Sequence, residues 1–395
     1  MHLAIVSPFP PTITGIGQYG YHVARAIVES NTFSRVSILA GAGRGRRAAS
    51  KIGSAEIDYC WQPDQLDALP AIQSRVKRLN PDLVWFNLGA SAFGRSPLAN
   101  VLGMSAPFWT RKLGIPTVVT LHEVVALADL RALNAPGGIF APLGARLLTK
   151  IATQADVVCL TMGHYANWLS ARGVDCVHIP IGAYRRPEFL EEGAEQEILF
   201  FTTLAPFKGL EILLDAFTAL RTEFPNLKLT IAGTTHVRFP NYADDLKRQF
   251  NGAQNVRWLG EAPEEKVMEL FRNAQIVALP YTASTGSSSV LYQAATWGRA
   301  VVASDLIENK NLARENNLQI EFFQNGDSQS LQSALRNLLI SPERRASQAR
   351  QNFNAIQKFS PAETCAHYLQ AFNRSLEKHK SPKRIPAAVR EADFT

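Results

Sequence analysis

The chain has 395 residues, of which 46% are apolar, and its formal net charge is +7. This length predicts two or three domains with substantial cores. No run of ~18 apolar residues occurs and no basic leader precedes the strand-like Leu3–Val6, so neither a membrane-spanning helix nor a signal peptide is expected. The four cysteines lie far apart without CxxC spacing, which predicts reduced thiols of a cytoplasmic protein and argues against a disulfide or zinc framework.

The net positive charge lies entirely in the first half of the chain. Residues 1–190 contain 18 Lys/Arg and 11 Asp/Glu, whereas residues 191–395 contain 23 of each. A basic half suits an anionic membrane, a lipid phosphate or an acidic substrate; the alternative is a solvated face that only aids solubility. No basic platform with interleaved aromatic residues and no helix-turn-helix pattern occurs, so nucleic acid is not an expected partner.

Strand-like apolar runs alternate with helical patterns, as is typical of parallel α/β sheets. In the first half, strands are expected at residues 3–7, 36–39, 83–86, 116–121, 157–160 and 177–179. In the second half, they are expected at 197–201, 227–232, 256–259, 276–279, 300–303 and 319–323. A composition change at 182–195 predicts a linker, and residues 41–47 and 91–104 are expected to form mobile loops.

A glycine-rich turn follows the first expected strand. Gly15, Gly17 and Gly20 form a GxGxxG pattern, which lets a ligand approach the backbone closely and occurs in dinucleotide dehydrogenases. The acidic residue that such enzymes carry after the second strand is missing, because this strand ends Leu39-Ala40-Gly41. The pattern predicts either a binding loop or only a tight turn.

His122 and Glu123 directly follow the strand expected at 116–121. Ligands bind outside the carboxyl ends of strands in open α/β sheets, so a polar side chain at this place is a candidate contact to substrate. His122 would hydrogen-bond a hydroxyl or orient a second substrate. The alternative is a loop histidine without a role.

Two more candidates follow strands of the second half. Lys208 begins a helical pattern, where a cation is unfavourable unless an anion binds nearby. Thr285 and Gly286 lead into Ser287-Ser288-Ser289 and another helix. Free backbone N–H groups and hydroxyls at a helix N-terminus suit a diphosphate. The alternatives are a solvated lysine and an ordinary serine cap.

Taken in order, these motifs resemble the GT-B glycosyltransferases of the large retaining family 4, the glycosyl transferases group 1. The resemblance is close over residues 195–305 and looser over nearly the whole chain. It implies two Rossmann-like domains with parallel sheets that face each other across a cleft. Residues 1–185 would bind the acceptor, and residues 186–375 would bind a nucleotide sugar. The last helix, at about 361–376, would cross back to the first domain, and residues 377–395 would form a tail.

The resemblance also implies roles for individual residues. His122 would lie near the transferred sugar and Lys208 at the diphosphate, and both are the candidate catalytic residues. The chain departs from the family where Thr202 and Thr203 replace a Gly-Arg pair, and where two glutamates are replaced. The donor-binding residues would be Gly15, Gly17, Thr203, Lys208, Thr285, Gly286, Ser287, Ser288 and Gln293, with Thr285 and Gln293 at the places of the two glutamates.

We therefore expect transfer of a sugar from a nucleoside-diphosphate sugar to a glycan or lipid-linked acceptor, with retention, in surface polysaccharide or glycoconjugate synthesis. The setting would be the cytoplasm, with peripheral contact to an anionic membrane. The missing glutamates support one alternative, a non-catalytic nucleotide-sugar-binding partner of a glycosyltransferase, and weigh against another, a GT-B-shaped epimerase. The absence of HExxH, EF-hand and Asp-x-Asp patterns predicts neither a metal nor a cofactor.

Overall fold

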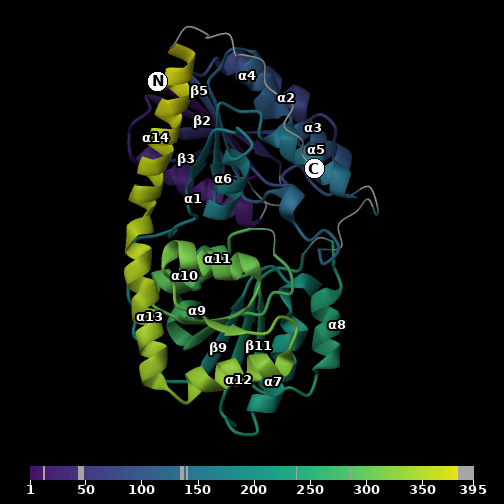
Figure 1. The fold of residues 1–395 in the computed structure, drawn as a ribbon, viewed down its shortest axis with the longest axis vertical. Coiled ribbons are helices and arrows are strands. Elements are labelled where there is room, and N and C mark those ends of the chain that lie inside the picture. Colours follow the sequence, from purple (N-terminus) through teal and green to yellow (C-terminus); the bar gives the residue numbers. More distant parts are fainter. Residues whose placement is uncertain are drawn as a thin grey trace. The chain divides into compact units, whose positions relative to one another are not determined.

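The computed structural model of the protein describes residues 1–11, 14–42, 49–133, 138, 141–236, 238–284 and 286–380. The chain divides into two compact units, each built on one sheet (Figure 1). The first unit contains most of the N-terminal half up to Tyr184 and also the final helix from Pro361. The second unit runs from Arg185 to Ser360. No helix of the described residues is long and apolar enough to cross a membrane.

The first unit contains eight strands, β1 (His2–Ser7), β2 (Arg35–Gly41), β3 (Lys51–Ile52), β4 (Ala55–Trp61), β5 (Leu83–Leu88), β6 (Thr117–Leu121), β7 (Val157–Leu160) and β8 (Cys176–His178). They form one sheet in the order β3-β4-β2-β1-β5-β6-β7-β8. All neighbouring pairs are parallel except the short hairpin β3–β4. The chain runs outward from β1 on one side and from β5 on the other, so the carboxyl ends of β1 and β5 form a switch point where ligands bind in such sheets.

The helices of this unit are α1 (Gly15–Glu29), α2 (Ala68–Leu79), α3 (Pro97–Met104), α4 (Ala106–Lys112), α5 (Ala141–Ala152), α6 (Gly163–Ser170) and α14 (Pro361–Lys380), with a 3-10 turn η1 (Val125–Leu127). Helix α1 forms because Thr14 caps its first turn and because its apolar face, which includes Val23, Ala24 and Ile27, is buried.

Helix α14 is anchored to the first sheet at its far end. The buried Asp156 lies 2.9 Å from His379 Nε2, and Asp175 pairs with Arg374 and Lys378. The helix therefore continues to Lys380, four residues beyond its expected end, because these ion pairs fix its last turn. The tail expected from residue 377 thus begins later, and residues 381–395 lie outside the described residues.

The second unit contains six strands, β9 (Glu197–Phe201), β10 (Lys228–Ala232), β11 (Val256–Gly260), β12 (Ile276–Leu279), β13 (Ala300–Ser304) and β14 (Glu321–Phe323). They are all parallel, in the order β11-β10-β9-β12-β13-β14. Here β9 and β12 form the switch point. The helices are η3 (Pro206–Lys208), α7 (Leu210–Leu220), α8 (Tyr242–Gln249), α9 (Glu264–Asn273), α10 (Ser289–Thr296), α11 (Ile307–Asn316), α12 (Ser328–Leu339), α13 (Pro342–Ile356) and η4 (Gln357–Phe359).

The core of the second unit lies between its sheet and the pair α7 and α12, which pack against each other. Leu213, Leu214 and Phe217 of α7 are fully buried at helical spacing. They meet Leu335 and Leu338 of α12 beneath the central strands. This buried layer holds the carboxyl ends of β9, β10 and β12 in fixed positions beside one another.

Twelve expected strands are present, with ends within two residues of the observed ones. Strands β3 and β4 were not expected, although Ala55–Tyr59 of β4 alternates apolar and charged residues, which is the pattern of a half-buried strand. The loop expected at 91–104 contains α3, which Ser96 caps by accepting from the Ala99 N–H group. Most of the loop expected at 41–47 lies outside the described residues.

Candidate functional site

His122 lies at the switch point of the first sheet, as its place after β6 suggests. Its Nε2 is 2.7 Å from Asn87 Oδ1, at the end of the neighbouring strand β5. The Asn87 amide nitrogen donates to Ser7 Oγ and to the Ile16 carbonyl oxygen, each at 2.9 Å. Ser7 uses its own hydroxyl proton to bond the Pro8 carbonyl at 2.7 Å. These contacts join the ends of β1, β5 and β6 to the start of α1.

The network fixes the proton on the His122 ring. A carbonyl oxygen only accepts, so both partners of the Asn87 amide nitrogen require it to be the donor, and Oδ1 must face His122. Nε2 therefore carries the ring proton, and Nδ1 is an acceptor. Because burial removes hydration, the pKa of His122 falls to about 4, which keeps the ring neutral at neutral pH.

A buried aromatic wall supports the same ring. The Tyr19 ring meets His122 edge-on, with centroids 4.8 Å apart. The Tyr19 hydroxyl lies 2.7 Å from that of Tyr368 on α14, which in turn lies 2.9 Å from Thr120 Oγ1. Burial raises the pKa of both tyrosines well above the ordinary value, so both hydroxyls stay protonated. The final helix thus helps to hold His122 in place.

The glycine turn is built differently from a phosphate loop. The Gly17 N–H group donates to Thr14 Oγ1 at 2.9 Å, so the helix cap already uses it. A Cβ atom at Gly20 would lie 2.3 Å from Ser7 Oγ, so this glycine lets α1 approach the Asn87 network. Gly15 is exposed, and a Cβ atom there would meet nothing within 4 Å. Gly17 and Gly20 therefore serve helix capping and close packing, and Gly15 stays exposed at the start of α1.

Lys208 ends η3, the first helical turn after β9. Its Nζ lies 3.7 Å from the centroid of the Tyr281 ring, and no carboxylate of the described residues pairs with it. Gly209, at φ +65°, brings this turn against the end of β12, because a Cβ atom there would lie 1.9 Å from the Pro280 oxygen. The Thr282 N–H group also donates to the Phe207 oxygen at 3.0 Å. These backbone contacts hold a cation without a counter-ion at the second switch point.

Arg238 extends this positive region from the loop after β10, and His236 lies in the same loop. The His236 ring lies 5.9 Å from that of Phe207, and its backbone N–H donates to the Leu204 oxygen. Burial lowers the pKa of His236, and the charges of Arg238 and Lys208 lower it further. The sequence analysis missed both residues because no recognised motif contains them; their only signal was their place after a buried strand.

The serine loop lies between β12 and α10. Ser288 is the N-cap of α10 but makes no side-chain cap bond. The Ser288 hydroxyl is buried without a hydrogen-bond partner in the described part of the chain, and the buried Ser287 hydroxyl faces the buried hydroxyl of Tyr292. Gly286 is held by Ser284, whose Oγ donates to its carbonyl oxygen at 3.0 Å. Buried hydroxyls without partners are costly, so this loop offers polar groups that a ligand can satisfy.

The remaining predicted donor contacts are Gln293, Thr203 and Thr285. Gln293 is half-buried one turn into α10, and its side-chain amide makes no hydrogen bond with the described residues. Thr203 is half-buried just before η3. Thr285 lies outside the described residues. Four predicted site residues thus follow the neighbouring strands β9 and β12, namely Lys208, Gly286, Ser287 and Ser288. Three others belong to the first unit, namely Gly15, Gly17 and His122.

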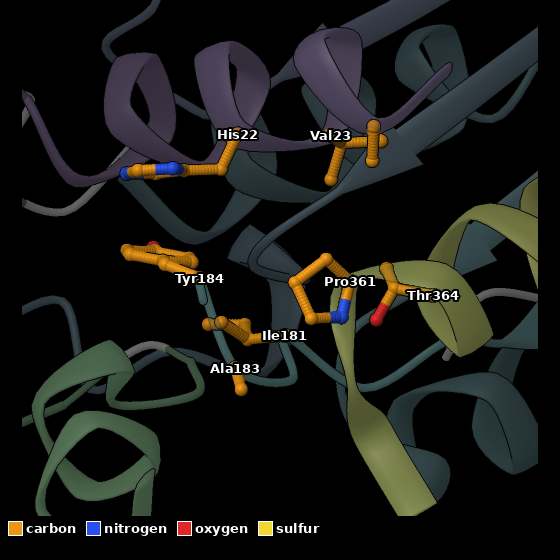
Figure 2. A pocket seen from close by; sticks show the side chains of 8 residues that line it. His22, Val23, Ile181, Ala183, Tyr184, Pro361 and Thr364 are labelled. Atoms are coloured by element: carbon orange, nitrogen blue, oxygen red, sulfur yellow. The ribbon is translucent and has the colours of Figure 1, made fainter. Parts of the chain in front are cut away.

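Two further features complete the description. In the described ranges, no group of His, Cys, Asp and Glu side chains is placed to hold a metal ion. A small pocket of the first unit lies where α1, residues 181–184 and the start of α14 meet (Figure 2). There His22 stacks on Tyr184 with ring centroids 4.4 Å apart. None of the predicted site residues lines this pocket.

Comparison with known proteins gives matches in both halves. The family "Glycosyl transferase 4-like domain" matches residues 14–182, and "Glycosyl transferases group 1" matches residues 195–341. A phosphatidyl-myo-inositol mannosyltransferase of Mycobacterium tuberculosis is 28% identical over 51% of this chain, and the match spans about half, 51%, of the relative's own length. The homologue from Mycobacterium leprae is 25% identical over 86% of this chain and 87% of its own.

Solved structures share the fold at lower identity. Anabaena HepE, solved in complex with UDP and glucose, has a TM-score of 0.71 and 18% identity, over 94% of this chain and 99% of its own. Sucrose-phosphate synthase of Thermosynechococcus elongatus has a TM-score of 0.75 and 14% identity, over 96% of this chain and 100% of its own. With two parallel-sheet units, two family matches and these neighbours, the chain belongs to the GT-B glycosyltransferases of the glycosyl transferases group 1 type.

Proposed function

We propose that the protein transfers a sugar from a nucleoside-diphosphate sugar to a glycan or lipid-linked acceptor. The observation that carries this proposal is the cation Lys208, which pairs with no carboxylate of the described residues and follows β9, the neighbour of the strand that leads to the serine loop. Ser288 adds a buried hydroxyl that has no partner among the described residues, and Ser287 adds a second buried hydroxyl at the N-terminus of α10. A diphosphate satisfies all of these groups at once, because it supplies negative charge and several acceptor oxygens.

The same groups would promote departure of the nucleoside diphosphate. Negative charge grows on the leaving phosphate as the glycosidic bond breaks, and donors already in position stabilise that charge most strongly. Lys208 is held by the backbone contacts of Gly209, so it need not reorganise. Arg238 adds positive charge from the loop after β10, and His236 in the same loop, whose pKa is lowered in the free protein, takes up a proton when the diphosphate binds. We therefore assign the charge neutralisation to protein cations, and treatment with EDTA should leave turnover unchanged.

The neutral residues fit the sugar and the ribose. Gln293 can accept a hydrogen bond from a ribose hydroxyl through its free amide oxygen. His122 offers Nδ1 as an acceptor for a hydroxyl of the sugar or of the acceptor, since Nε2 is committed to Asn87. Retention of configuration at the anomeric carbon belongs to the same proposal. It rests on family membership alone.

Relatives suggest the substrate classes. The mycobacterial relatives are phosphatidyl-myo-inositol mannosyltransferases, so a lipid acceptor with a polyol headgroup is a reasonable class for this chain. HepE was solved with UDP and glucose, which supports a uridine or similar diphosphate donor. We place the product in surface polysaccharide or glycoconjugate synthesis, at the inner face of a membrane.

The test is an assay of the full chain with a panel of nucleotide sugars, with and without polyol lipids. We expect nucleoside-diphosphate release that requires an acceptor, together with a heavier acceptor by mass spectrometry. Binding without release for every donor would instead favour a non-catalytic nucleotide-sugar-binding partner, which Gln293 in place of a glutamate supports. Conversion of a donor into an isomer of the same mass would indicate an epimerase.

A further inference from the structure

Tyr292 lies one turn into α10, and its side chain is fully buried. The N-cap of this helix is Ser288, so Ser287 directly precedes the cap and Tyr292 is the fourth helical residue. Side chains at these two positions commonly pack against each other, and the usual pair is apolar. Here the pair is polar, because the buried Tyr292 hydroxyl faces the buried Ser287 hydroxyl.

Asn316, the last residue of α11, approaches the same tyrosine hydroxyl. Its side chain is buried, and its amide nitrogen donates to the Leu312 oxygen at 2.8 Å. This nitrogen carries two protons, so one remains for the phenol oxygen of Tyr292. Burial raises the pKa of Tyr292 above its ordinary value, and the nearby Ser287 and Asn316 side chains lower it only in part. The phenol therefore stays protonated and donates in turn.

The direction of these contacts leaves one proton without an acceptor. With Asn316 donating to the phenol oxygen, the phenol proton goes to Ser287 Oγ, and the hydroxyl proton of Ser287 needs another acceptor. Apart from Tyr292, no group of the described residues hydrogen-bonds Ser287 Oγ. A buried hydroxyl proton without an acceptor is costly, so the loop favours a ligand that supplies acceptor oxygens.

We propose that Tyr292 positions Ser287 as a hydrogen-bond donor to the nucleoside diphosphate. Tyr292 acts through the Ser287 oxygen and not by contact with the ligand. A hydroxyl that already accepts one hydrogen bond is a stronger donor, and it loses less rotational freedom when a phosphate binds. The inference deepens the proposed function and rests on it in one respect, namely that a diphosphate lies at the start of α10.

The experiment is a double-mutant cycle on the full chain, measured as nucleotide affinity by calorimetry. The probe is whichever of UDP, GDP and ADP binds the native protein most tightly. Ser287→Ala should weaken binding about tenfold, because it removes a hydrogen bond to a charged group. Tyr292→Phe, which removes only the hydroxyl, should weaken binding about fivefold. The double variant should bind no more than about twofold worse than Ser287→Ala, because Tyr292 acts only through Ser287.

Thr296→Val is the matched control. Thr296 lies one turn later on α10 and is also buried, but its hydroxyl donates to the Tyr292 carbonyl oxygen at 2.8 Å, within the helix. We expect this variant to keep the native nucleotide affinity although it loses a buried hydroxyl. Circular dichroism and thermal unfolding check that every variant is folded and compare the stabilities of the variants.

Single losses that multiply to about fiftyfold in the double variant would overturn the proposal. Native affinity in Tyr292→Phe, whatever its stability, or an equal loss of affinity in Thr296→Val would indicate a purely structural role and overturn it as well. Failure of the proposed function would appear separately, as the expected coupling between Ser287 and Tyr292 without release of nucleoside diphosphate from any nucleotide sugar. Binding of none of the three nucleotides would overturn both.

Discussion

The hydrogen bond between Asn87 and His122 gives a sharp prediction for the variant Asn87→Asp. In the native protein, Asn87 Oδ1 accepts from Nε2 at 2.7 Å, and burial lowers the pKa of His122 to about 4. A carboxylate at this distance stabilises the protonated ring, and an opposite charge this close typically raises a pKa by about 1–3. We therefore expect a pKa of about 5–7 for His122 in the variant.

The consequence can be worked out for a chosen pH. At pH 6, the protonated fraction of His122 should rise from about 1% to between roughly 10% and 90%. Protonation fills Nδ1, the atom proposed to accept a substrate hydroxyl. Turnover of the variant should therefore fall as pH decreases through about 5–7, whereas that of the native protein should persist to about 4.

The assay combines NMR titration of the His122 ring nitrogens with the pH dependence of kcat. Ser7→Ala is the matched control, because it removes one partner of the Asn87 amide nitrogen but keeps the bond from Oδ1 to His122. We expect Ser7→Ala to leave the tautomer and the pH profile unchanged. An Asn87→Asp variant whose ring titration and pH profile match those of the native protein would refute this assignment of the network.

Three further predictions concern the second unit. Gln293→Ala should raise the KM of the donor and leave kcat nearly unchanged, since a ribose contact is made equally in the ground and transition states; a fall in kcat alone would contradict this role. A bound diphosphate favours the protonated form of His236. Binding of UDP to the native protein should therefore be coupled to proton uptake between about pH 5 and 7, measured by calorimetry in several buffers, and this uptake should be smaller for the His236→Asn variant. Gly209→Ala should lower the free energy of unfolding in urea by more than the control Gly114→Ala, for which ~1–2 kcal/mol is expected. Both glycines have positive φ, but only Gly209 lies against another atom, the Pro280 oxygen. Equal losses in the two variants would contradict this close contact.

Much of the architecture could be predicted because buried parallel strands are continuous apolar runs. Residues 157–160, 197–201 and 276–279 were predicted with the ends that the structure shows. His122, directly after β6, and Lys208, in the first turn after β9, were chosen as site candidates for the same reason. The carboxyl ends of parallel strands meet at one edge, so position along the chain translates into position at the site.

The rest depends on contacts that sequence spacing does not encode. Asn87 lies within an apolar strand, and only the structure shows that it orients His122. His236 lies outside any motif. The Gly17 N–H group was expected at a phosphate, but Thr14 is three residues earlier and captures it as a helix cap. Local hydrogen bonds of this kind compete with ligand contacts, and a motif alone does not say which one forms.

The most direct test of the central claim is calorimetric titration of the full chain with UDP and with UMP. A diphosphate site built around Lys208 predicts that UDP binds at least about tenfold more tightly than UMP, because only UDP places a second phosphate beside this cation. Lys208→Ala should remove most of that difference and leave the affinity for UMP nearly unchanged. Equal affinities for UDP and UMP in the native protein, or an undiminished preference in Lys208→Ala, would contradict the account.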